Sequence, residues 1–230
     1  GILPALSAKH SKKDTTSYKD TLGNALNIAV VFSLPAMFGL IVLSNHIIVS
    51  LFQYGSFTIN DTLMSSMSLI AYSIGLPAFI LMKVLLTGFF SRQDTKTPVK
   101  YGMIAVLFNI IMNLSVLSYY MINPFDGAHA FLALATSLSA WLQVILLYNN
   151  LRNSGYINKS IFWAKPNYQS LLSCIIMAII LSYTLIDILE WAKNVYYMRG
   201  SLLLLYIIFG AAIYALIMYL LGYKIKKNYI

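Results

Sequence analysis

The sequence predicts an all-α protein, a polytopic membrane bundle of six transmembrane helices. The chain of 230 residues is 59% hydrophobic and only 10% charged, and its mean hydropathy is +0.73. A water-soluble domain cannot bury so much apolar surface. The apolar residues gather in six stretches, each long enough for the roughly 20 residues that a helix needs to cross a bilayer. We therefore expect one membrane bundle and no soluble domain.

Short polar connections separate these stretches. In chain order the stretches are Leu22–Ser50, Leu69–Phe90, Val99–Ile122, Ala128–Leu151, Leu171–Leu189 and Gly200–Tyr223. The residues Gly1–Leu6 resemble the tail of a preceding helix, and no signal peptide is recognisable at the start. We therefore expect the chain to be the C-terminal portion of a longer protein.

The first and second stretches each contain a proline, Pro35 and Pro77. Proline removes a backbone hydrogen bond and its ring presses on the carbonyl one turn earlier, so we expect a kink near each. A freed carbonyl must face protein or water instead of lipid, and interrupted helices often line a transport path. Proline is also common in ordinary membrane helices. Both a gating role and a purely structural one are open for these two residues.

The second stretch also carries Lys83, a full charge well inside a span. Ionisable residues inside membranes are often functional, because their burial is costly. Facing the bundle interior, Lys83 would hold a phosphate or a carboxylate from another helix. Alternatively, its side chain snorkels toward the cytoplasmic headgroups, about 10 Å away along the helix.

Polar side chains distinguish the third and fourth stretches. Asn109 and Asn113 are four residues apart and share one helix face, and Thr136 belongs to the fourth stretch. Their oxygen atoms would suit a small hard cation. The same groups would also join two helices by hydrogen bonds, each contributing about 0.6 kcal/mol. From spacing alone we favour the second interpretation.

A polar connection at residues 152–170 divides the chain. It separates a four-helix part, residues 1–151, from the last two stretches, residues 171–230. Those two stretches are almost purely apolar, and Ala211 and Ala215 have the small-xxx-small spacing that allows close helix contact. They would form an apolar groove for a long hydrocarbon chain, or simply face bulk lipid. Aromatic residues flanking them are expected in the headgroup layer: Trp163, Tyr168, Trp191, Tyr196 and Tyr197.

Lysines and arginines gather at alternate connections. They lie before the first stretch, in the connections between the second and third and between the fourth and fifth, and after the sixth. These residues are Lys9, Lys12, Lys13, Lys19, Arg92, Lys96, Lys100, Arg152, Lys159, Lys165, Lys224, Lys226 and Lys227. The other connections hold only Lys193 and Arg199. Because basic loops stay on the cytoplasmic side, both ends of the chain are predicted to be cytoplasmic. The same rule explains the net charge of +9 without a nucleic-acid partner.

The sequence holds no constellation typical of an enzyme. Its seven acidic residues lie at or beyond the ends of the stretches, its three histidines are scattered near loops, and its one cysteine, Cys174, lies in an apolar stretch. Neither a pair of catalytic carboxylates nor a cluster of metal ligands is recognisable. A membrane-embedded enzyme would therefore lack the residues that catalysis needs, and no cofactor is predicted.

Several motifs resemble the lipid II flippase family known as MurJ or MviN. They are Leu3–Ser7, Leu51–Thr58, Ala71–Leu76, Leu132–Leu138 with Ala140 and Trp141, and above all Ser91–Lys100, which reads SRQDTKTPVK. The resemblance covers nearly the whole chain and is closest up to Leu151. Beyond that point the likeness lies in hydropathy and in the Leu221–Lys224 ending.

The resemblance implies transport by alternating access in the bacterial inner membrane. Such flippases have fourteen helices and move undecaprenyl-linked peptidoglycan precursor from the cytoplasmic to the outer leaflet. The six stretches would then be helices nine to fourteen, packed against membrane lipids and against an N-terminal lobe of the same protein. Two alternatives are a related polysaccharide-lipid or drug exporter of the same superfamily and a membrane scaffold of cell-wall synthesis.

The resemblance also bears on the charged turn and on the amide pair. Arg92, Asp94 and Lys96, followed by Pro98, form a turn that would brace a cytoplasmic gate through ion pairs, or merely satisfy topology. Some family members bind sodium at places that match Asn109, Asn113 and Thr136. Here an amide, Asn113, stands where a carboxylate would favour the ion. The coupling ion is therefore open, and the membrane potential alone is an alternative driving force.

Overall fold

The computed structural model describes residues 2–11, 14–157 and 164–223, and its regular secondary structure there is entirely helical. In chain order the helices are α1 (Ile2–Ser11), α2 (Thr15–Phe52), α3 (Ile59–Phe90), α4 (Lys96–Ile122), α5 (Ala128–Asn153), α6 (Lys165–Thr184), α7 (Ile188–Lys193) and α8 (Tyr196–Leu220). All except α1 and α7 are long and apolar enough to span a membrane, six candidates among the described residues. The predicted fold class is therefore confirmed.

Helices α3 and α6 begin earlier than the predicted stretches. Helix α3 begins at Ile59 instead of Leu69, since the Thr58 and Asp61 side chains each accept the other's backbone N–H in a capping box. The polar first turns of this helix carry no hydropathy signal. Helix α6 begins at Lys165, so the connection predicted to run to residue 170 is shorter.

The fifth predicted stretch is two helices, α6 and α7. Helix α6 ends at Thr184, and Asp187 then accepts the Leu189 backbone N–H at 2.7 Å to start α7. Trp191 of α7 is fully buried, so its predicted place in the headgroup layer is wrong. Its indole N–H donates to Ser50 at 3.0 Å, and this bond holds α7 against α2.

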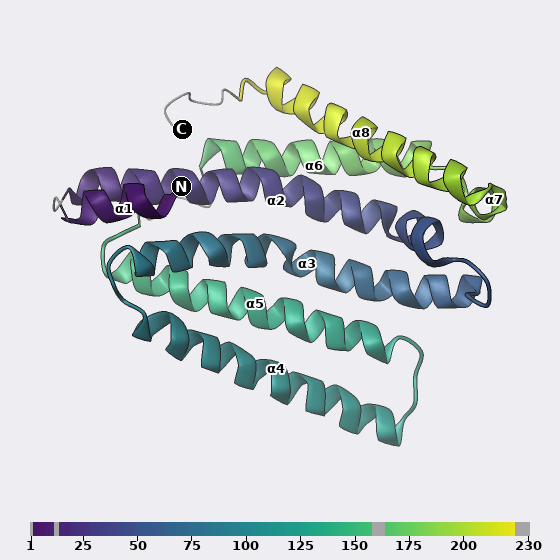
Figure 1. Cartoon of the computed structure of the whole chain (residues 1–230), viewed down its shortest axis with the longest axis horizontal. Coiled ribbons are helices and arrows are strands. Elements are labelled where there is room, and N and C mark those ends of the chain that lie inside the picture. Colours follow the sequence, from purple (N-terminus) through teal and green to yellow (C-terminus); the bar gives the residue numbers. More distant parts are fainter. Residues whose placement is uncertain (1, 12–13, 158–163, 224–230) are drawn as a thin grey trace.

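Helix α2 is the central element of the fold. In Figure 1 it lies between a layer of α3, α5 and α4 on one side and the pair α6 and α8 on the other. One core packs the first half of α2 against the second halves of α3 and α5, with Leu22, Leu85 and Leu147 at its centre. A second core packs the other half of α2 against α6, α7 and α8 around Trp191. Helix α4 contacts mainly α5, which leaves most of its surface exposed.

The basic connections within the described part of the chain lie together. Helices α2, α4 and α6 begin, and α3, α5 and α8 end, at the same end of the bundle (Figure 1). Lys193 and Arg199 lie at the other end. There Arg199 donates to the carbonyls of Asn194 at 2.8 Å and Gln53 at 3.2 Å, and to that of Ala192. These carbonyls, at the ends of α7 and α2, satisfy the charge of the arginine. This explains why an arginine lies at the end of the bundle where basic residues are otherwise few.

Several predicted residues lie outside the described part of the chain. Lys12, Lys13, Lys159 and Trp163 fall between the described segments, and Lys224, Lys226 and Lys227 follow the last one. Tyr168 and Tyr197 are described, and both are exposed.

Candidate functional site

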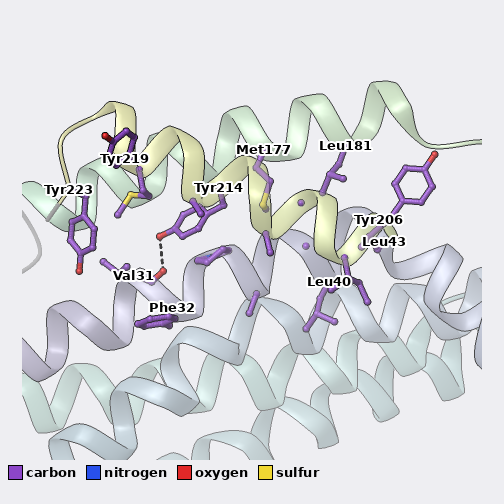
Figure 2. A pocket seen from close by; sticks show the side chains of 18 of the residues that line it. Val31, Phe32, Leu40, Leu43, Met177, Leu181, Tyr206, Tyr214, Tyr219 and Tyr223 are labelled. Atoms are coloured by element: carbon purple, nitrogen blue, oxygen red, sulfur yellow. Dashed lines mark hydrogen bonds between the residues drawn. The ribbon is translucent and has the colours of Figure 1, made fainter. Parts of the chain in front are cut away.

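A groove of about 800 Å³ runs between α2, α6 and α8. Its α2 wall extends from Val31 to Ile47, which at 1.5 Å per residue is about 24 Å, close to the roughly 30 Å hydrocarbon core of a bilayer. Figure 2 shows Leu40, Leu43, Met177 and Leu181 on its apolar walls. The rim residue Phe32 is 66% exposed, so the groove opens to the outer surface of the bundle.

Small residues make the groove hollow. Pro35, Ala36 and Gly39 line it from α2, while Gly210, Ala211 and Ala215 line it from α8. A Cβ atom at Gly39 would have no heavy atom within 4 Å, so this position faces open space. A Cβ atom at Gly210 would lie 3.0 Å from Leu181 Cδ1, because α8 there approaches α6 closely. Ala211 and Ala215, whose spacing predicted a close helix contact, therefore line a cavity.

An aromatic cluster closes the groove at the end near α7. Tyr206 lines the groove and lies 5.7 Å from the Trp191 ring, between ring centroids. The Tyr206 hydroxyl donates to the Thr184 carbonyl at 2.7 Å. His46 meets the Trp191 ring edge-on at 4.7 Å, and its Nε2 lies 2.9 Å from the Ile186 carbonyl oxygen. These contacts join α2, the end of α6, α7 and α8 into one rigid end wall.

One polar contact crosses this apolar groove at the Val31 end of its α2 wall. The hydroxyl of Tyr214, on α8, donates to the carbonyl of Val31, on α2, at 2.7 Å (Figure 2). Val31 lies four residues before Pro35, so its carbonyl is the one that the proline leaves without a helical donor. The prediction that freed carbonyls face protein instead of lipid is confirmed here. Helix α2 bends in Figure 1, as does α3.

The bend of α3 near Pro77 is braced by α5 instead. Ser137 donates to the Ala71 carbonyl at 2.6 Å, and the Trp141 indole N–H donates to the Ile74 carbonyl at 3.0 Å. Pro77 itself is buried. The two prolines are therefore not equivalent, because Pro35 lines the open groove whereas Pro77 lies in a packed helix contact.

Lys83 is exposed on the outer face of α3 and does not line the groove. Tyr72 and Phe90 share this helix face, and they are 48% and 45% exposed. Within the described part of the chain, the Lys83 ammonium group forms no ion pair. The outer face of α3 thus carries one exposed cation, with an exposed aromatic ring on each side of it along the helix.

The turn between α3 and α4 holds its charges differently from the prediction. The Arg92 guanidinium lies over the Tyr156 ring at 4.2 Å and the Phe89 ring at 5.1 Å. Asp94 accepts the Thr97 backbone N–H at 3.0 Å. Among the described residues no ion pair joins the charges of this turn, since the single salt bridge there is Glu190–Lys193. Stacking replaces the carboxylate as the partner of the arginine.

The carboxylate of Asp94 accepts a backbone N–H in the first turn of helix α4, which begins at Lys96, three residues before the predicted stretch, and contains Pro98 in that turn. Burial raises the pKa of Asp94, but the hydrogen bonds from Thr97 and the Arg92 charge outweigh it and hold the pKa below its ordinary value. Lys96 is exposed. The turn is thus a capped helix start beside a stacked arginine.

Asn109, Asn113 and Thr136 do lie together. Asn109 Nδ2 lies 3.4 Å from Thr136 Oγ1, and Asn113 Nδ2 donates to Asn109 Oδ1 at 3.1 Å. Asn113 Oδ1 is a buried acceptor without a hydrogen-bond donor. A small hard cation needs about six oxygen ligands, whereas these three side chains offer three oxygens, of which Asn109 Oδ1 and Thr136 Oγ1 already accept amide N–H groups. The arrangement fits a helix-to-helix hydrogen-bond chain better than a bound sodium ion.

Sequence reasoning missed the partners of Pro35 and Arg92. Tyr214 and Tyr156 carry no local signal, because each acts on a residue far away in the chain. Tyr156 also belongs to a ring cluster with Tyr18, at 5.5 Å, and His10, at 6.5 Å. The proline predicts a free carbonyl, but not which side chain satisfies it.

Comparisons with known proteins agree with this architecture. A protein-family model described as "Lipid II flippase MurJ" matches residues 1–205. The "Probable lipid II flippase MurJ" of Vibrio cholerae serotype O1 is 36% identical over 227 residues, 98% of this chain and 42% of that protein. The "Lipid II flippase MurJ" of Burkholderia cenocepacia is 30% identical over 225 residues, 97% of this chain and 42% of that protein.

A solved structure is similar as well. It is described as "Lipid II flippase MurJ, inward closed conformation", and the match has a TM-score of 0.72 at 26% identity. The match covers 96% of this chain and 42% of the other. The chain therefore spans less than half the length of the proteins that it matches.

Proposed function

The chain belongs to the lipid II flippase MurJ family, and from this membership we propose that the full-length protein flips a lipid-linked peptidoglycan precursor. It is a multi-pass protein of the bacterial inner membrane. The proposed substrate is the undecaprenyl-linked precursor, which moves from the cytoplasmic to the outer leaflet by alternating access. This is transport and involves no covalent chemistry.

The groove between α2, α6 and α8 is the observation that supports this proposal. A flippase must hold a long hydrocarbon tail while a polar headgroup crosses, and the tail needs an apolar path along the membrane. The groove offers about 800 Å³ over most of the hydrocarbon thickness, and its exposed rim gives access from lipid. We assign it to the prenyl tail.

We assign roles to the other predicted site residues from where each lies in the bundle. Lys83 lies on the exposed face of α3, where its ammonium would meet the precursor's phosphates or a carboxylate of the N-terminal part of the same protein. The turn of Arg92, Asp94 and Lys96 lies at the basic, cytoplasmic end of the bundle, where a gate must close. Pro35 and Pro77 are the bends about which the lobe changes shape. With both ends of the chain in the cytoplasm, the aromatic end wall of the groove lies on the outer side of the membrane.

The amide cluster does not supply a cation-driven step in this proposal. Asn109, Asn113 and Thr136 are hydrogen-bonded to one another, so we propose that they hold α4 against α5. The membrane potential then drives the cycle.

Filling the groove tests the function. In the full-length protein, Gly39→Phe places a ring in the open space around Gly39, and it should abolish precursor flipping in proteoliposomes. Leu204→Phe is the matched control, because Leu204 lies on the outer face of α8, 61% exposed and outside the groove. Equal flipping by the two variants would refute the assignment of the groove.

Depletion in cells separates the alternatives. Loss of a flippase should stop precursor delivery and lyse the cells, whereas loss of a drug exporter should change only drug sensitivity. A scaffold should tolerate Lys83→Ala together with Arg92→Ala. The flippase proposal predicts that this double variant fails to support growth.

A further inference from the structure

We propose that Tyr214 is a positioning residue that couples the hydrocarbon chain in the groove to the bend of α2 at Pro35. This inference rests on the proposed function, since it takes the groove as the tail site. It goes further by assigning one hydroxyl as the connection between tail binding and the shape of the central helix.

The first step concerns the Val31 carbonyl. Proline has no N–H, so Pro35 leaves this carbonyl without its helical donor. The Tyr214 hydroxyl donates to it at 2.7 Å. Tyr214 also lies 2.8 Å from the Ser170 hydroxyl. Since the tyrosine proton is committed to Val31, the serine is the donor of that second bond, and one hydroxyl joins α2, α6 and α8.

The second step concerns where this bond lies. Val31, Pro35 and Tyr214 all line the groove, and Figure 2 shows the Tyr214 ring reaching from α8 to α2. In an empty, hydrated groove, water can replace the tyrosine as donor to the carbonyl. A hydrocarbon chain removes the water, and an unsatisfied carbonyl in hydrocarbon costs several kcal/mol. A filled groove therefore favours the state in which Tyr214 holds the bend of α2.

The third step is reciprocity. If a bound chain favours the Tyr214–Val31 bond, then a shape of α2 that breaks the bond must bind the chain more weakly by the same factor. Straightening or further bending of α2 during transport would thus release the tail. The coupling acts through one hydrogen bond across the groove, whereas the core around Trp191 holds α2 and α8 together at the other end.

The other proline bend provides a contrast. Around Pro77 the donors are Ser137 and Trp141 on α5, and the contact is tightly packed. A Cβ atom at Gly75 would lie only 2.5 Å from Ser137 Oγ. No groove residue takes part in that contact. Of the two bends, the one at Pro35 is the one that a tail can reach.

The test measures tail binding and the shape of α2 in the full-length protein. Undecaprenyl phosphate is the probe, and its Kd is measured in nanodiscs. Spin labels at Asp20 and Leu51, which flank Pro35 and are both exposed on α2, report the bend as a distance distribution. Tyr214→Phe removes only the hydroxyl. Tyr183→Phe is the matched control, since Tyr183 lies on α6 outside the groove and is 87% exposed.

We expect Tyr214→Phe to weaken binding by about threefold, the effect of a lost membrane hydrogen bond, up to about a hundredfold, the effect of a carbonyl left unsatisfied. The probe should narrow the distance distribution in the wild type but not in this variant. Tyr183→Phe should behave as the wild type. If Tyr214→Phe binds as tightly as Tyr183→Phe, the coupling is refuted.

Pro35→Ala makes the test specific for the orphan carbonyl. Alanine restores a backbone N–H for Val31, so in the Pro35→Ala background Tyr214→Phe should change the Kd less than about twofold. A loss that persists undiminished in that background would overturn the proposal. If Tyr214→Phe alone fails to fold, the double variant decides, because only this proposal predicts that it folds and binds.

Failure of this inference is distinct from failure of the proposed function. If Gly39→Phe leaves the Kd for undecaprenyl phosphate unchanged, the groove is not the tail site and the proposed function fails with it. If Gly39→Phe abolishes binding while Tyr214→Phe and Tyr183→Phe have the same Kd, only the coupling is wrong.

Discussion

Replacing Gly75 by alanine should loosen the contact between α3 and α5. The new Cβ atom would lie 2.5 Å from Ser137 Oγ, 2.9 Å from Ser137 Cβ and 3.0 Å from Phe79 Cε2. Real Cβ atoms do not approach neighbours so closely, so Ser137 must move and its 2.6 Å bond to the Ala71 carbonyl is lost.

The magnitude follows from three contributions to the free energy of unfolding. Overpacking costs about 1–3 kcal/mol, and the lost hydrogen bond costs about 0.6 kcal/mol. Alanine regains about 0.5–1 kcal/mol, because glycine loses more backbone entropy in a helix. The net destabilisation is about 1–3 kcal/mol, and the melting temperature should fall by several degrees.

The assay is thermal unfolding of the full-length protein in detergent, followed by tryptophan fluorescence. Gly39→Ala is the matched control, since a Cβ atom there meets nothing within 4 Å and should leave stability unchanged or raise it. Adding Ser137→Gly to Gly75→Ala removes both Ser137 atoms from the clash and should recover part of the loss. The reasoning is refuted if Gly75→Ala and Gly39→Ala melt at the same temperature.

Three further predictions concern the turn after α3 and the amide cluster. Arg92→Lys should lower thermal stability by about 0.5–2 kcal/mol through loss of stacking on Tyr156, and equal melting would exclude that contribution. The pKa of Asp94 is depressed by the fold, so its stabilisation is present above the ordinary value of about 3.9 and is lost as the pH falls through the folded pKa. Acid unfolding of Asp94→Asn should therefore be less steep than that of the wild type, and identical curves would contradict this. Flipping should be equal in sodium and potassium buffers, and Asn113→Asp should introduce a sodium dependence; a sodium requirement in the wild type would dismiss the hydrogen-bond interpretation.

Hydropathy predicted the six spans because the bilayer requires long apolar helices, and the composition leaves no other solution. It could not predict where helices end. Helix α3 starts early at the capping box of Thr58 and Asp61, and Asp187 divides the fifth stretch. Trp191 was predicted to lie in the headgroups, since an aromatic residue beside a polar loop usually does. Its burial depends on Ser50 and His46, which lie on a helix far away in the sequence.

The candidate site was predictable only in its local chemistry. Pro35 indicated an unsatisfied carbonyl, and the spacing of Ala211 and Ala215 indicated a small-residue face. The hollow itself needs Gly39 and those alanines on different helices at the same depth, which is a tertiary fact. Likewise, the charges of Arg92 and Asp94 suggested an ion pair, but Tyr156 competes for the guanidinium, and Thr97 takes the carboxylate.

The central claim is that the groove between α2, α6 and α8 holds the tail of the transported lipid. Photo-crosslinking tests it most directly, with a benzophenone amino acid at position 39 of the full-length protein in membranes that contain the precursor. We predict a prenyl-lipid adduct from position 39 and mostly phospholipid adducts from position 204 on the outer face of α8. The same mixture of bulk phospholipids at both positions would contradict the claim.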